Sequence, residues 1–139
     1  MRAVLDPNIR ISALLSPAGA PARVVTAWRE GGFELIASPL LLDELGRALS
    51  YPKLRKRITA EESAAVIAWI SRESTIAGDG ESPPARSSDP GADDLIALAE
   101  SQRAALVSGD SDLLALKEAL PIFTAAGFLD WLAAHADAA

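Results

Sequence analysis

The chain of 139 residues has no cysteine and only one histidine. The lack of cysteine excludes disulfides and thiolate metal sites. The histidine, His135, lies near the C-terminus in alanine-rich sequence that we expect to fray. We therefore do not expect catalysis built on histidine, and the chemistry of the chain has to come from other side chains.

Long apolar runs and an excess of positive charge are also missing. No apolar run is long enough to cross a bilayer and the first residues lack a signal-peptide layout, so we expect a soluble cytoplasmic protein without membrane association. The chain carries 19 acidic and 13 basic residues, a net charge of −6. That balance disfavours a protein held to nucleic acid by bulk charge alone. A polyanionic partner would need a local basic patch or bound cations.

Half of the residues are hydrophobic, and the length suits one domain over residues 1–139. Short apolar runs predict buried strands that alternate with helical segments, which predicts an α/β fold with a mainly parallel central sheet. The predicted strands are 3–5, 33–37, 104–108 and 121–123. The predicted helices are 9–15 with Asn8 as N-cap, 20–30, 39–49, 60–76, one beginning near 92, 113–118 and one beginning at 124. A surface loop is predicted over 78–91.

Acidic residues stand at strand ends and at a helix start in this pattern. Asp6 ends the first strand and Asp110 follows the strand over 104–108. Asp93 or Asp94 opens a helix, and the apolar positions beside them do not decide which one faces the strands. Because ligands collect outside the carboxyl ends of parallel strands, a wound sheet can bring these acids to one edge.

A further acid, Glu44, falls inside the apolar arc of its helix, whereas Asp43 falls on the polar side. A carboxylate facing the interior is costly unless it is paired or bound to a cation. Clustered carboxylates repel one another, and a hard divalent cation such as Mg²⁺ or Mn²⁺ relieves that repulsion. The same ion supports phosphodiester cleavage without histidine.

Each of these features also has a simpler structural role. Asp93 and Asp94 favour a helix N-terminus, and Asp110 is a good N-cap. The joint placement of the acids with an inward-facing Glu44 favours a shared site. The chain has one dense basic run, which is as consistent with a solvated turn as with a nucleic-acid contact. This run contains Lys53, Arg55, Lys56 and Arg57.

Four short segments, taken in order, carry a family resemblance. They are Val4-Leu5-Asp6-Pro7-Asn8, Ser38-Pro39 followed by Leu42-Asp43-Glu44-Leu45, Asp93-Asp94-Leu95-Ile96-Ala97, and Leu106-Val107-Ser108-Gly109-Asp110-Ser111-Asp112-Leu113. In these segments the chain resembles the PIN-domain family, particularly the VapC-like toxin nucleases of bacterial toxin–antitoxin pairs. The resemblance covers nearly the whole chain.

The resemblance implies a three-layer α/β/α fold and an Mg²⁺- or Mn²⁺-dependent endoribonuclease. It implies a homodimer and a small antitoxin protein that blocks the site. It chooses Asp93 over Asp94, and so gives Asp6, Glu44, Asp93 and Asp110 as the catalytic acids. Among these, Asp6, Asp93 and Asp110 would hold the metal. Asn8 and Asp112 would support them, and the basic run would contact RNA.

Two positions depart from the family pattern. Pro7 stands where a hydroxyl residue is usual, and Arg10 replaces a usually apolar residue, so we expect the first helix to face solvent or a partner there. A non-catalytic binding module with the same fold is the alternative. Aspartate-nucleophile phosphatases also begin with a strand that ends in Asp, but their second Asp would stand where this chain has Asn8.

Overall fold

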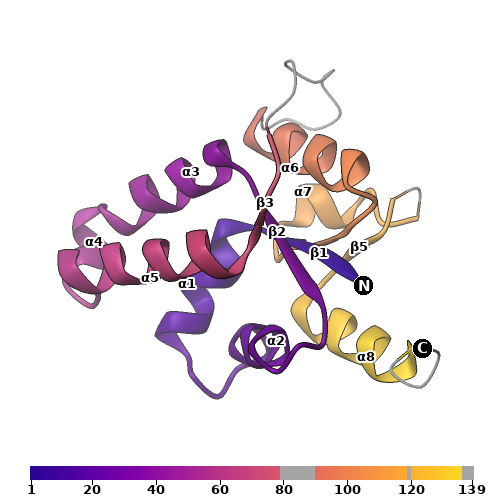
Figure 1. The fold of residues 1–139 in the computed structure, drawn as a ribbon, viewed down its shortest axis with the longest axis horizontal. Helices are drawn as coiled ribbons and strands as arrows, with labels where there is room; N and C mark the ends of the chain where they lie inside the picture. Colours follow the sequence, from indigo (N-terminus) through magenta and orange to yellow (C-terminus); the bar gives the residue numbers. More distant parts are fainter. Residues whose placement is uncertain (79–89, 119, 136–139) are drawn as a thin grey trace.

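The computed structural model describes residues 1–78, 90–118 and 120–135, and these form a parallel sheet covered by helices (Figure 1). The sheet has five strands in the order β3-β2-β1-β4-β5. All four strand pairs are parallel. The strands are β1 (Arg2–Leu5), β2 (Glu34–Ala37), β3 (Thr75–Ile76), β4 (Ala105–Val107) and β5 (Ile122–Phe123). The first strand of the chain is therefore the central one.

Helices cover both faces of the sheet, as expected for an all-parallel arrangement. Alternate residues of the strands point to opposite faces, so that Ala3 and Leu5 belong to one core and Val4 to the other. Figure 1 shows α2 and α8 on one side of the sheet and α6 and α7 on the other. The helices are α1 (Pro7–Leu15), α2 (Ala20–Arg29), α3 (Pro39–Leu49), α4 (Pro52–Arg55), α5 (Ala60–Glu73), α6 (Pro90–Ser101), α7 (Ser111–Leu114) and α8 (Ala125–His135). This confirms the predicted three-layer α/β/α fold.

Local sequence signals set several of these helix ends. The Ser38 hydroxyl accepts a hydrogen bond from the Leu41 N–H at the start of α3, and a proline follows in the first helical position. Thr59 and Glu62 form the predicted capping box of α5. Gly31 adopts a positive φ of 82° just beyond α2, a conformation that glycine adopts without a steric cost.

Four predicted elements differ from the structure. The N-cap of α1 is Asp6 rather than Asn8, because the helix begins two residues earlier than predicted, at Pro7. Helix α5 ends at Glu73 rather than Ile76, since Thr75–Ile76 pairs with β2 as the edge strand β3. The short helix α4, which overlaps the basic run, was not predicted. Helix α7 spans Ser111–Leu114 instead of 113–118.

The predicted surface loop over 78–91 falls mostly on residues 79–89, which lie outside the described residues. Within the described part of the chain, none of the helices combines the length and the apolar composition that crossing a membrane requires.

Candidate active site

Asp6 lies at the carboxyl end of the central strand, with 6% of its surface exposed. Its backbone N–H continues the β1–β4 ladder by donating to the Val107 carbonyl, 3.0 Å away. Its side chain accepts a hydrogen bond from the Asn8 N–H at 3.0 Å and one from the Ser108 hydroxyl at 2.8 Å. Both donors are uncharged, and together they fix the carboxylate at the sheet edge.

Ser108 is fully buried and joins two of the predicted acids. Its hydroxyl donates to Asp6 and accepts a hydrogen bond from the Asp110 N–H at 3.0 Å. The ends of β1 and β4 are thereby tied together, and Asp6 is brought into one hydrogen-bonded unit with the backbone of Asp110. Sequence analysis missed this residue. A serine after a strand is common, and its role appears only when Asp6, 102 residues away, is beside it.

Asp93 lies in the first turn of α6 and is 6% exposed, whereas the neighbouring Asp94 is half-buried. Helix α6 packs against β1 and β4 and leads back to the amino end of β4. Its N-terminal turn therefore lies toward the carboxyl ends of the strands, where Asp6 also lies. The burial distinguishes the two acids that the apolar pattern left equivalent.

Glu44 is half-buried on α3, partway between solvent and the interior position that its helical phase predicted. It lines a narrow cleft with Asp94 and Ser38, so the two carboxylate residues border one space from opposite helices. The cleft has about 10 Å³ of room, which is about enough for one water molecule or a small ion. Glu44 thus borders the same space as Asp94, not Asp93.

The remaining predicted site residues stand around this edge. Asp110 is half-buried and lies immediately before α7, which is the N-cap position that the sequence predicted as its alternative, purely structural role. Asn8 is exposed and contributes its backbone N–H to Asp6. The side chain of Asp112 lies outside the described residues.

Arg10, which we expected to face solvent or a partner, is buried with 4% of its surface exposed. None of its three guanidinium nitrogens has a hydrogen-bond partner among the described residues. Burial lowers the pKa of Arg10 to about 10, and the negative charge of Asp6 opposes that change. Arg10 therefore remains a cation at neutral pH, and the carboxylate of Asp6 is the charge that favours its protonated form.

The donor set of this edge is carboxylate and hydroxyl oxygen, which suits Mg²⁺ or Mn²⁺. Among the residues that the structure describes, no three His, Cys, Asp or Glu side chains lie close enough to hold one ion together. Mg²⁺ usually keeps several waters and binds through one or two carboxylates plus substrate phosphates. Glu44 and Asp94, which line one cleft, and Asp6, which is held by Ser108, are each compatible with that mode.

The basic run forms an exposed surface on α4 and the turn after it. Within the described parts of the chain, Arg2–Glu34 is the one ion pair formed, so none of the four cations of the run pairs with a described acid. These residues are Lys53, Arg55, Lys56 and Arg57.

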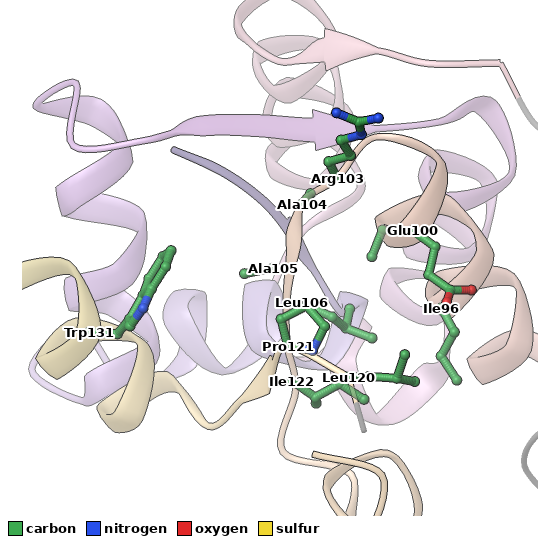
Figure 2. A pocket seen from close by; sticks show the side chains of 11 residues that line it. Ile96, Glu100, Arg103, Ala104, Ala105, Leu106, Leu120, Pro121, Ile122 and Trp131 are labelled. Carbon is green, nitrogen blue, oxygen red and sulfur yellow. The ribbon is translucent and has the colours of Figure 1, made fainter. Parts of the chain in front are cut away.

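A cavity of about 390 Å³ lies at the opposite, amino edge of the sheet (Figure 2). It is bordered by Arg103 and Ala104, which precede β4, and by Pro121, which precedes β5. Trp131 of α8 lies on one side of it and Ile96 of α6 on the other (Figure 2). Because none of the predicted acids borders this cavity, it is separate from the acidic edge.

Comparison with known proteins agrees with this architecture. A family profile described as PIN domain matches residues 2–112, and the chain belongs to the PIN domain family. The uncharacterized protein MJ1680 of Methanocaldococcus jannaschii is 30% identical over 120 residues, which cover 85% of this chain and 76% of that protein. The crystal structure of VapBC2 from Rickettsia felis, bound to a DNA fragment from the promoter, contains a chain with the same fold. It matches with a TM-score of 0.58 and 13% identity, over 88% of this chain and 97% of that one.

Proposed function

We propose that the protein is a divalent-metal-dependent endoribonuclease and acts as the toxin of a toxin–antitoxin pair in the cytoplasm. The observation that carries the proposal is the buried Asp6, held at the carboxyl end of the central strand by Ser108, which also binds the backbone of Asp110. Membership of the PIN domain family supports the nuclease activity. The fold shared with a chain of VapBC2 supports the toxin role and an antitoxin partner.

In this proposal Mg²⁺ or Mn²⁺ keeps several waters and binds through one or two carboxylates at a time from the set Asp6, Asp93 and Asp110. Glu44 completes the acidic edge. The ion, when bound, supplies positive charge to the scissile phosphate and lowers the pKa of a bound water. The chain itself fixes the first carboxylate through Ser108 and the Asn8 N–H, so that its orientation does not have to be set at the moment of reaction. Asn8 and Asp112 are proposed as supporting residues.

The basic run is the surface that best suits a contact with RNA. The chain as a whole has a net charge of −6, but this run presents four exposed cations. We propose that Lys53, Arg55, Lys56 and Arg57 contact the phosphate backbone of RNA. In a homodimer, which the family resemblance implies, two such runs would border one substrate.

The test is incubation of the purified protein with mixed RNAs in Mn²⁺, in Mg²⁺ and in excess chelator. Discrete RNA fragments that form with either ion and not with chelator are expected. Fragments that form equally with chelator would refute the metal-dependent mechanism.

One observation favours a non-catalytic binding module instead. Arg10 already places a buried positive charge in the field of Asp6, which opposes the binding of a cation there. If the purified protein binds RNA or an antitoxin but leaves every RNA intact in both ions, this second function is the correct one.

A further inference from the structure

A second cavity, of about 330 Å³, lies between α1, α2 and α5, and most of the residues that line it are apolar. Trp28 and Trp69 form part of its wall, with their ring centroids 4.8 Å apart and their planes at 44°. Leu14 lies at its border and is one of the few large apolar side chains that remain exposed. The volume falls in the range of about 300–1,000 Å³ that is typical of pockets for small molecules.

Charge in this cavity has one sign. Of the residues that the structure describes, the charged ones in the lining are both arginines, Arg10 and Arg29, and no acid lines it. The Arg29 guanidinium lies over the Trp69 ring, 5.8 Å from its centroid. In a chain with six more acidic than basic residues, two cations beside one apolar space make a site that favours an anion.

Arg10 is the residue that calls for a ligand. A buried guanidinium without hydrogen bonds is strongly unfavourable, and buried polar groups in folded proteins are nearly always satisfied. All three guanidinium nitrogens of Arg10 lack a hydrogen-bond partner among the described residues, although only 4% of the surface of this residue is exposed. The field of Asp6 offsets part of the charge but supplies no hydrogen bond. A carboxylate is the planar acceptor that matches the guanidinium with two parallel hydrogen bonds.

We propose that this cavity binds a small amphipathic carboxylate, with its acid group on Arg10 and its apolar body against Trp28 and Trp69. The guanidinium nitrogens of Arg10 are buried, so this proposal requires the side chain to change rotamer when the acid binds. Although the charge of Asp6 acts on Arg10, none of the predicted acids lines this cavity, and binding in it does not require nuclease activity.

The experiment measures binding of 4-phenylbutyrate and octanoate, each against its neutral amide, by titration calorimetry and tryptophan fluorescence in chelating buffer. The wild-type protein is expected to bind at least one acid about tenfold or more tightly than its amide. Arg10→Met keeps the length of the stem and should remove that preference. Arg72→Met, an exposed arginine at the end of α5, is the matched control and should behave as wild type.

Ala22→Phe fills the cavity from α2 without touching the charge of Arg10, and it should abolish binding of acid and amide alike. It decides the matter if Arg10→Met does not fold. Failure of both acids to bind, equal binding of acid and amide, or unchanged acid binding in a folded Arg10→Met or Ala22→Phe protein would each overturn the proposal. So would an acidic apolar peptide that binds through Arg10 while both small acids do not, because the site would then belong to a protein partner.

Discussion

At the amino ends of the strands an arginine and a glutamate form an ion pair, whereas toward the carboxyl ends two acids, Asp6 and Asp93, are buried. On the amino edge the Arg2 Nε lies 3.0 Å from the Glu34 Oε2, and the Arg2 Nη1 donates to the Gln102 carbonyl at 2.8 Å. The Thr75 hydroxyl also donates to Glu34. These contacts join the starts of β1, β2 and β3 to the residue that follows α6, and they pair each charged group with a partner of opposite charge or with a hydrogen-bonding group.

The carboxyl edge of the same strands is built differently. The hydrogen bonds to Asp6 come from two uncharged donors, and Asp93 is buried in the first turn of α6. Burying a carboxylate is unfavourable in a protein whose stability is only a small difference between large terms. The contacts at the amino edge therefore stabilise the fold, whereas the buried acids toward the carboxyl edge have a cost that the proposed function would explain.

The largest expected effect is loss of cleavage in Asp6→Asn. The amide keeps the shape and still accepts hydrogen bonds, but it removes the charge that would hold a metal ion. RNA cleavage in Mn²⁺ should fall by at least about 100-fold, the scale of losing one preorganised electrostatic group. The rate of fragment formation on gels, with circular dichroism to confirm folding, measures this. Cleavage at the wild-type rate would show that Asp6 does not take part in the reaction, and the burial of acids toward the carboxyl edge would then need another explanation.

The next prediction concerns the roles of Asp93 and Asp94, the two neighbouring acids in α6. A benefit from the helix macrodipole should be similar for both, about 0.3–1 kcal/mol. If the buried Asp93 is a metal ligand, Asp93→Asn abolishes cleavage and weakens Mn²⁺ binding, while Asp94→Asn leaves both near wild type. Parallel activity assays and Mn²⁺ titrations decide between them.

The opposite result would also locate the site. A larger loss in Asp94→Asn would move the third acid to the cleft that Asp94 shares with Glu44. Equal, mild losses of cleavage and Mn²⁺ binding in the two variants would show that Asp93 and Asp94 only stabilise the start of α6. Asp89, the next candidate, lies outside the described residues.

A third prediction concerns stability without any substrate. An ion that binds only the folded state adds RT ln(1 + [L]/Kd), about 2.7 kcal/mol at a hundredfold excess over Kd. Mn²⁺ should therefore raise the Tm of the wild-type protein, and the increase should shrink in Asp6→Asn and Asp110→Asn. Calorimetric scans over a Mn²⁺ series measure it. A Tm that does not respond to Mn²⁺ would mean that the acids do not share a binding site.

Local signals were enough to predict much of the fold. Ser38-Pro39 and the Thr59 capping box fix helix starts through bonds to residues three positions away, so the sequence alone reveals them. The two-residue strand β3 was missed because nothing local separates it from α5; pairing with β2, about 40 residues earlier, makes it a strand. Helical position predicted that Glu44 faces inward, and the structure leaves it half-buried.

The chemistry of the site depends more on contacts that are distant in sequence. Asp6 was identifiable because a strand ends there, but the partner that fixes it, Ser108, comes from another strand. The first helix was expected to face solvent or a partner at Arg10, because arginine stands there in place of a usually apolar residue. The burial of Arg10 follows from the packing of α1 against α2 and α3, which no local pattern encodes. Residues that violate local expectation are those where function is most often found.

The smallest expected effect tests the amino edge. The hydrogen bond from Thr75, and then the contacts with Arg2, hold the pKa of Glu34 below its usual 4.5. A carboxyl group whose pKa is lowered on folding stabilises the protein above its unfolded pKa, and that contribution disappears as the pH falls through the folded pKa. Glu34→Gln should therefore lower Tm slightly at pH 7 and have no effect at a pH well below 4.5. Because the Arg2–Glu34 pair is exposed, 1 M NaCl should reduce the difference in Tm at pH 7.

Thermal melts at the two pH values and two salt concentrations measure this difference. Thr75→Val is the matched variant, because it removes the hydrogen bond that lowers the pKa of Glu34 most. A difference between wild type and Glu34→Gln that persists at low pH would show that Glu34 acts through packing, and the amino edge would then not be held by charge.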